Sequence, residues 1–183
     1  MKQYGIAALM TGLLLLAGSC GQGSNPKKQI EKLESEVYND KFNFDVKGIA
    51  TAKELFKSYI GYANANPNKE ETPGYLFRAA DLSMNLNMPD SALKYYNEII
   101  YKYPSFAKVP ESLFMLVFIY ENYKQDYGKA TKIYKQFIEQ YPNHEFADDA
   151  AKCIENMGKS PEELIKEFEK NNQVKAEADS ANI

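Results

Sequence analysis

Apolar and polar positions recur in the same order in two segments of the chain, 92–104 and 130–142. The matched positions, all 38 residues apart, are Ala92 and Ala130, Tyr96 and Tyr134, Ile100 and Ile138, and the closing Tyr-Pro pairs at 103–104 and 141–142. Within each segment the apolar residues are three or four positions apart, which is the spacing of one helix face. A repeat of this length predicts a stacked helical solenoid.

Each segment follows another helical stretch, so the predicted unit is a pair of helices. The first pair begins at Thr72-Pro73, where Thr suits the N-cap and Pro the first helical position. The second pair begins near Pro110 and turns at 123–127. The side chains expected to point inward are Leu76, Ala79, Ala80, Leu82, Ser83, Ala92, Tyr96, Ile99 and Ile100, then Leu113, Leu116, Val117 and Tyr120.

Two helices are predicted before these pairs, within segment 27–71. Lys27–Tyr38 has a narrow apolar stripe of Ile30, Leu33 and Val37, spaced as on one helix face. Gly48–Asn64 has a broader apolar face and ends before Pro67, which cannot continue a helix. We interpret 27–71 as N-terminal helices of a degenerate repeat.

A further first helix is predicted from about Glu145, with inward Ala147, Ala150, Ala151 and Ile154, and Gly158 as its left-handed stop. Ser160, Pro161 and Glu163 then form the start signal of a last helix. Its apolar residues, expected to seal the open end of the stack, are Leu164, Ile165 and Phe168. The repeat domain with this capping helix is predicted to span 72–170, and 171–183 to be a frayed polar tail.

The repeated residues resemble the tetratricopeptide repeat. That pattern places a large apolar residue, an apolar–small pair and an aromatic on the first helix, then Ala, an aromatic and a closing Pro on the second. The chain departs from it at Ser83, which replaces the aromatic, and at Val117, which replaces the small residue. The resemblance implies an all-α fold, a right-handed α-α superhelix.

The first 19 residues have the layout of a secretory signal: Lys2, an apolar stretch from Ile6 to Ala17, and small residues before Cys20. Segment 16–20 resembles a bacterial lipobox, with Ala17 where that motif usually has Leu. The resemblance implies that Cys20 is acylated and that 20–26 is a flexible tether. An ordinary cleaved signal with an incidental Cys is the alternative. By the sorting rule known for such lipoproteins, Gly21 in place of Asp after the Cys implies the outer membrane, and the lack of an acidic run after Cys20 favours the periplasmic side.

Signal and repeats together resemble outer-membrane assembly lipoproteins of the BamD/YfiO type and tetratricopeptide lipoproteins of Bacteroidetes. Most of this resemblance lies in 110–168. It implies a non-enzymatic, lipid-anchored adaptor of the bacterial cell envelope that binds protein partners, with outer-membrane protein assembly as one context. A glycan- or nutrient-binding accessory lipoprotein is the alternative, although the chain has no Trp for a sugar platform.

The composition argues against nucleic-acid binding, catalysis and metal binding. The net charge is −3, which offers no basic footprint for nucleic acid. His144 is the single His, Cys153 reads as a small core residue, and no metal-ligand spacing or phosphate loop is present. We therefore expect neither an enzyme nor a cofactor.

The concave face of a tetratricopeptide array is lined by the first helix of each repeat. By position, the residues that the resemblance places there are Phe77, Asp81, Met84, Phe114, Phe118 and Glu121, followed by Asp148, Lys152 and Glu155. Phe77, Met84, Phe114 and Phe118 would form an apolar strip of the kind that marks a binding surface. Either a partner peptide or the chain's own N-terminal segment, with Phe42 and Phe44, would cover it.

Overall fold

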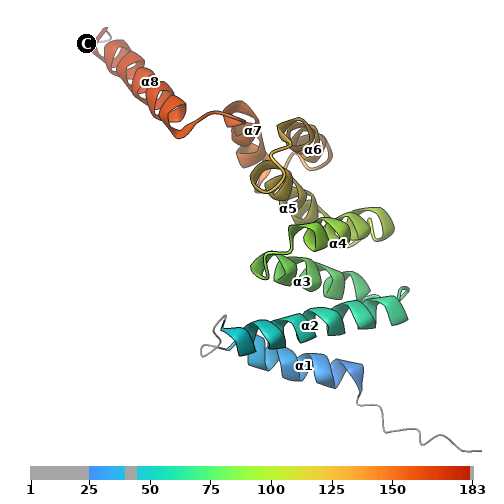
Figure 1. Cartoon of the computed structure of the whole chain (residues 1–183). Helices are drawn as coiled ribbons and strands as arrows, with labels where there is room; N and C mark the ends of the chain where they lie inside the picture. Colours follow the sequence, from blue (N-terminus) through green and yellow to red (C-terminus); the bar gives the residue numbers. More distant parts are fainter. Residues whose placement is uncertain (1–24, 40–44, 182–183) are drawn as a thin grey trace, which may run out of the picture.

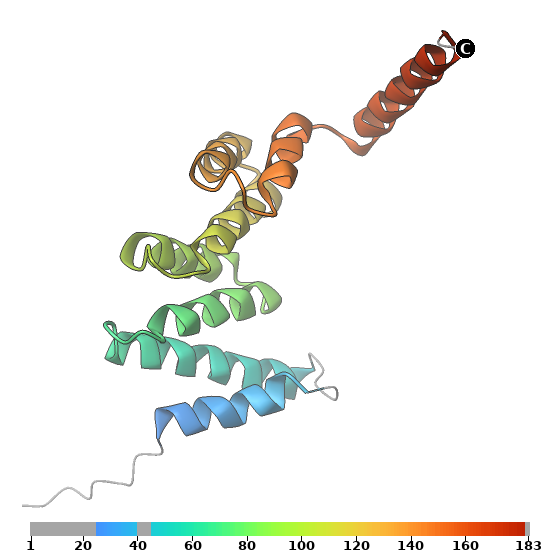
Figure 2. The ribbon, with the colours of Figure 1, turned by 180° about the vertical axis from the view of Figure 1, so that it is seen from behind.

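The computed structural model describes residues 25–39 and 45–181, with side chains up to Gln173. Within these residues the chain forms eight α-helices and no strand. Their bounds are α1 Pro26–Val37, α2 Val46–Ala65, α3 Thr72–Asn85, α4 Pro89–Lys102, α5 Val109–Asn122, α6 Tyr127–Gln140, α7 Ala147–Asn156 and α8 Pro161–Ala181. From α1 to α7 each helix packs against the next, as Figures 1 and 2 show. The predicted all-α solenoid is confirmed. Cys20, Phe42 and Phe44 lie outside the described residues.

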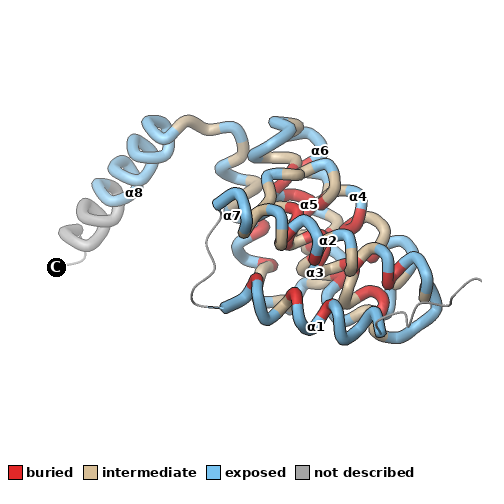
Figure 3. Tube along the Cα trace, turned by 60° about the horizontal axis from the view of Figure 1, so that its bottom comes forward, coloured by how far each residue is buried: buried red, intermediate tan, exposed pale blue. Residues whose placement is uncertain are grey.

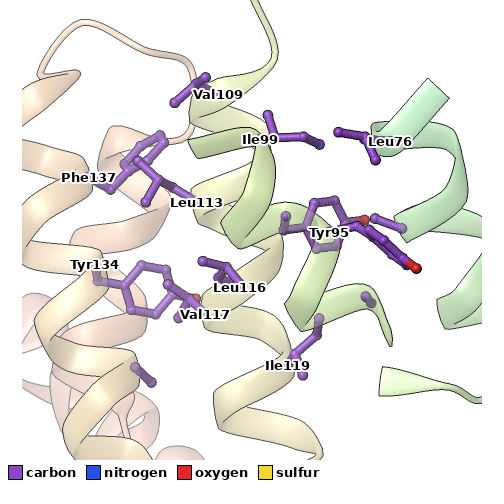
Figure 4. Packing of buried hydrophobic residues seen from close by; sticks show 14 of the residues in the cluster. Leu76, Tyr95, Ile99, Val109, Leu113, Leu116, Val117, Ile119, Tyr134 and Phe137 are labelled. Atoms are coloured by element: carbon purple, nitrogen blue, oxygen red, sulfur yellow. The ribbon is translucent and has the colours of Figure 1, made fainter. Parts of the chain in front are cut away.

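The matched Ala and Tyr positions within the second helices of the two repeats belong to the core. Ala92 and Ala130 are fully buried, which lets neighbouring helix backbones approach closely. Tyr96 and Tyr134 are buried as well, and in Figure 4 Tyr134 and Phe137 of α6 lie against side chains of α5. One cluster of buried side chains runs from α2 to α7 and another joins α1, α2 and α3. Phe56 and Ile60 contact both clusters, so the core is continuous along the stack.

The turns between successive helix pairs share one hydrogen-bond pattern. The Phe106 N–H donates to the Tyr103 carbonyl at 2.9 Å, and the His144 N–H, 38 residues on, donates to Tyr141 at 3.0 Å. The turn after α2 follows the same pattern, because the Lys69 N–H donates to the Asn66 carbonyl at 3.1 Å. This similarity is what a degenerate repeat at α1–α2 would produce, and that interpretation stays a prediction.

Two local predictions were wrong. Thr72 is not an N-cap: α3 begins at Thr72 itself, and the Thr72 hydroxyl donates to the Asn66 carbonyl, which ties down the preceding turn. Ala151 does not point inward but is exposed, because no following helix covers that side of α7. Ile100 and Tyr120 are only partly buried.

The prediction for the last helix was half right. Its start signal is confirmed: the Ser160 N–H donates to Glu163 Oε2 at 2.8 Å, and the Glu163 N–H donates to Ser160 Oγ at 3.2 Å. It does not seal the stack, however, because α8 points away from α7 and its described part is exposed (Figures 1 and 3). Leu164, Ile165 and Phe168 are 36%, 58% and 66% exposed. The helix also continues to Ala181, through the segment expected to fray.

No helix in the described part of the chain is both long enough and apolar enough to span a membrane.

Candidate partner-binding site

An open hollow of about 770 Å³ lies at the C-terminal end of the stack. We call it the α5–α8 hollow. Its lining residues are Phe114, Glu121 and Asn122 of α5, Tyr127 of α6, Asp149, Lys152, Cys153 and Asn156 of α7, Gly158 and Lys159 of the following turn, and Ser160, Glu163 and Leu164 at the start of α8. Aromatic side chains, amides and charges of both signs therefore converge on one open surface.

The hollow brings together part of the predicted concave face. Phe114, Glu121 and Lys152 line it. Phe118 lies outside it on α5, 42% exposed, with its ring centroid 6.2 Å from that of Tyr123. Phe77, Asp81 and Met84 belong to the preceding repeat, and Asp148 and Glu155 are exposed on α7 without lining the hollow.

The expected strip of four exposed apolar side chains is not formed, because Phe77 and Phe114 pack into the repeat junctions. The Phe77 ring meets Tyr96 edge-on at 5.8 Å, and Lys108 Nζ lies 4.6 Å from its centroid. In the next repeat the Phe114 ring meets Tyr134 edge-on at 5.8 Å and Phe146 at 4.9 Å. Of the strip only Phe118 is exposed.

Asp81 and Phe118 occupy equivalent positions, and they change the surroundings of the buried tyrosine in each repeat. In the first repeat the Tyr96 hydroxyl donates to Asp81, and burial raises the pKa of the Asp81 carboxyl. Phe118 cannot accept such a bond. Burial raises the pKa of both tyrosines, and the hydrogen bond that adds to it is made with Asp81 at Tyr96 but with Cys153 at Tyr134. Asp81 thus serves packing within its repeat, whereas the second repeat leaves Phe118 free at the surface.

Sequence reasoning missed several residues of the hollow. The sequence predicts a turn at Tyr127, but this residue is the first of α6 and has 43% of its surface exposed. Asp149 and Lys152 form an exposed ion pair of 3.5 Å. Asn156 is the last residue of α7, which ends where the left-handed Gly158 was expected to stop it, but its place in the hollow was not predicted.

His144 and Cys153 contact neighbouring backbone and aromatic groups of the repeats. His144 Nδ1 accepts from the Phe146 N–H at 3.3 Å, and the His144 ring meets Phe137 edge-on at 5.4 Å. Cys153 is partly buried beside Tyr134. Among the described residues, no three His, Cys, Asp or Glu side chains are grouped to hold a metal ion.

The helix pairs stack one after another, which is the arrangement of an α-α solenoid built from repeats. The tetratricopeptide repeat family model matches residues 75–105, in α3–α4, and residues 111–144, in α5–α6, so two such repeats are detected in these segments. Domains of this family typically bind protein partners and are generally non-enzymatic scaffolds. No curated protein matches the chain.

Proposed function

We propose that the protein is a non-enzymatic interaction scaffold of the bacterial cell envelope, anchored by a lipid on Cys20 and facing the periplasm. A segment of a protein partner binds in the α5–α8 hollow. The observation that carries the binding role is the convergence of Phe114, Glu121 and Lys152 with Tyr127 and Asn156 on one open surface beside the two repeats. Outer-membrane protein assembly is the context that the lipoprotein resemblance favours.

The binding role is tested by site-specific photo-crosslinking in cells. A crosslinker at Lys152 or Asn156, inside the hollow, should capture a discrete protein, whereas one at exposed Lys132 on α6 should not. With the crosslinker at Asn156, reversing the hollow's charges with Glu121→Lys and Lys152→Glu should abolish the crosslink, since charged groups at an interface select the partner. Equal capture from all three positions contradicts the proposal. Phe114 is left unchanged because it packs within the fold.

The anchor and the context are tested separately. Cys20→Ser should prevent incorporation of a labelled fatty acid and release the protein from the membrane fraction, and continued labelling would contradict the anchor. Captured barrel-assembly proteins would support the assembly context. A rise in Tm on adding a polysaccharide, with no protein captured, would replace the scaffold role by glycan binding.

A further inference from the structure

The exposed side of α8 carries an apolar stripe that the repeats leave uncovered. At about 100° per residue, Leu164, Ile165 and Phe168 fall on one face of the helix. An open hollow of about 610 Å³ follows this stripe, with Asn156 of α7 at its border. We call it the α8 groove. An exposed apolar surface of this kind marks a docking site.

Acidic side chains flank the stripe on both sides. Glu167 follows one edge of the stripe and Glu169 the other, and both line the α8 groove. By the same helical geometry, Lys166 and Lys170 lie on the opposite face. Residues 147–183 carry nine Asp or Glu and five Lys, a net charge of −4, whereas residues 1–146 carry sixteen acidic and seventeen basic residues. The acidic excess of the chain therefore lies in its last segment, which includes the two glutamates of this groove.

The chain's own stack does not fit the stripe. The fourth residue of α4 and of α6 is a buried Ala, where helix backbones approach, but the fourth residue of α8 is Leu164. The eleventh residue of α8 is Asn171, where α4 and α6 have a buried apolar side chain. Packed like a second repeat helix, α8 would separate the backbones and leave an amide in the core.

The C-terminal helices of a second copy do not fit it either. Two facing α8 helices would place Glu167 and Glu169 against each other. The exposed side of α7 adds Asp148, Asp149 and Glu155, so it would repel α8 of another copy as well.

We propose that the α8 groove binds a basic amphipathic helix of the partner. Apolar side chains of that helix lie on Leu164, Ile165 and Phe168, a helix-in-groove arrangement. Its flanking Lys or Arg residues meet Glu169 and Glu167, and the one that meets Glu167 shares that carboxylate with Lys159. The proposal rests on the interaction role proposed above and gives that role a partner chemistry, at a surface next to the α5–α8 hollow.

The test uses the full chain in neutral lipid nanodiscs and three synthetic peptides of about 18 residues, five helical turns. One peptide is a Leu–Lys helix with an apolar stripe, the second has Glu in place of Lys, and the third has the first composition without the stripe. By fluorescence anisotropy the first should bind at least about tenfold more tightly than the others, a difference of ~1.4 kcal/mol. Its binding should weaken with salt and slow the hydrogen exchange of residues 161–173.

Variants on the two faces of α8 separate site binding from general charge attraction. Ile165→Ser with Phe168→Ser should weaken binding at least about tenfold, and because both side chains are exposed the fold should persist. Glu167→Lys with Glu169→Lys should transfer the preference to the acidic peptide. The matched control, Lys166→Glu with Lys170→Glu on the opposite face, should leave binding within about twofold although it makes the chain more acidic.

Several outcomes overturn the proposal. Equal binding of the peptide without a stripe, or tighter binding by the Lys166→Glu, Lys170→Glu control, means charge attraction alone. A dimer that Ile165→Ser with Phe168→Ser dissociates identifies a second copy as the occupant, and vesicle binding lost in that variant identifies a lipid surface. If the partner still crosslinks at Lys152 in that variant, the scaffold role stands without the α8 groove.

Discussion

The two ends of the stack carry helices with similar apolar stripes and opposite surroundings. The stripe of α1 consists of Ile30, Leu33 and Val37, and each of these residues has at most 5% of its surface exposed. The stripe of α8 is 36–66% exposed. Three apolar residues at helical spacing therefore predict an amphipathic helix in both places, but they do not determine whether a neighbouring surface accepts it.

Polar contacts across the helix junction account for part of the difference. Lys27 Nζ lies 2.6 Å from Glu71 Oε1, and the Tyr62 hydroxyl donates to the same oxygen at 2.7 Å. Further along α1, Glu34 accepts from Arg78 at 2.6 Å. In the described part of α8, by contrast, the ion pair of 2.6 Å between Lys159 and Glu167 joins the helix only to the turn before it. The N-terminal helix is thus held by the stack, and α8 is held by its own connection.

The largest difference in the free energy of unfolding is expected when one stripe residue is truncated at each end. Leu33→Ala should lower the free energy of unfolding by about 2–5 kcal/mol, because it leaves a cavity between α1 and α2. Phe168→Ala should change it by less than about 0.5 kcal/mol, since the ring is exposed. Urea unfolding followed by circular dichroism measures both. Equal losses would mean that α8 packs against the stack in solution.

A smaller effect is expected where the repeats require a small side chain. Ala130→Leu should cost about 1–3 kcal/mol, because α6 cannot then approach its neighbours closely. The reverse change at the equivalent position of α8, Leu164→Ala, should leave the unfolding midpoint nearly unchanged. A large loss from Leu164→Ala would instead show that Leu164 is buried against the stack in solution.

The sequence predicted the features that depend on local and repeated patterns. The helix pairs, the buried Ala and Tyr positions and the Ser160–Glu163 capping box follow from periodicity and cap chemistry, and the structure confirms them. The direction of α8 depends on backbone angles after Asn156, where Met157 is extended and Gly158 has φ 77°. The left-handed Gly158 was predicted as a helix stop, but neither periodicity nor cap chemistry carries information on the angles of Met157. The α5–α8 hollow was therefore predicted only in part, through Phe114, Glu121 and Lys152.

Gly158, in the connection before α8, gives the next prediction. Gly158→Ala should destabilise the connection by about 1–2 kcal/mol, since a side chain disfavours the left-handed region that Gly158 occupies. Faster hydrogen exchange at the Lys159 N–H, which donates to the Asn156 carbonyl at 3.1 Å, would report the loss. Gly61→Ala is the control: it lies inside α2 with no atom within 4 Å of the new Cβ, so it should stabilise by about 0.5–1 kcal/mol. No change at Lys159 would contradict the role of Gly158.

The smallest effect concerns acid and the N-terminal end. Hydrogen bonds from Lys27 and Tyr62 lower the pKa of Glu71 to about 2 from an ordinary value of 4.5. A lowered pKa means that the ionised carboxyl stabilises the docking of α1 above about pH 4.5, and that this contribution is lost as the pH falls towards 2. In the wild type, hydrogen exchange of α1 amides, corrected for the intrinsic rate, should therefore become faster as the pH falls from about 4.5 towards 2. Glu71→Gln should exchange faster than the wild type at pH 6 and converge with it near pH 2, whereas Glu70→Gln, at the adjacent exposed carboxyl, should follow the wild type throughout. No gap between Glu71→Gln and the wild type at any pH would mean that apolar packing alone holds α1, and that the two ends of the stack differ only in the surface each helix meets.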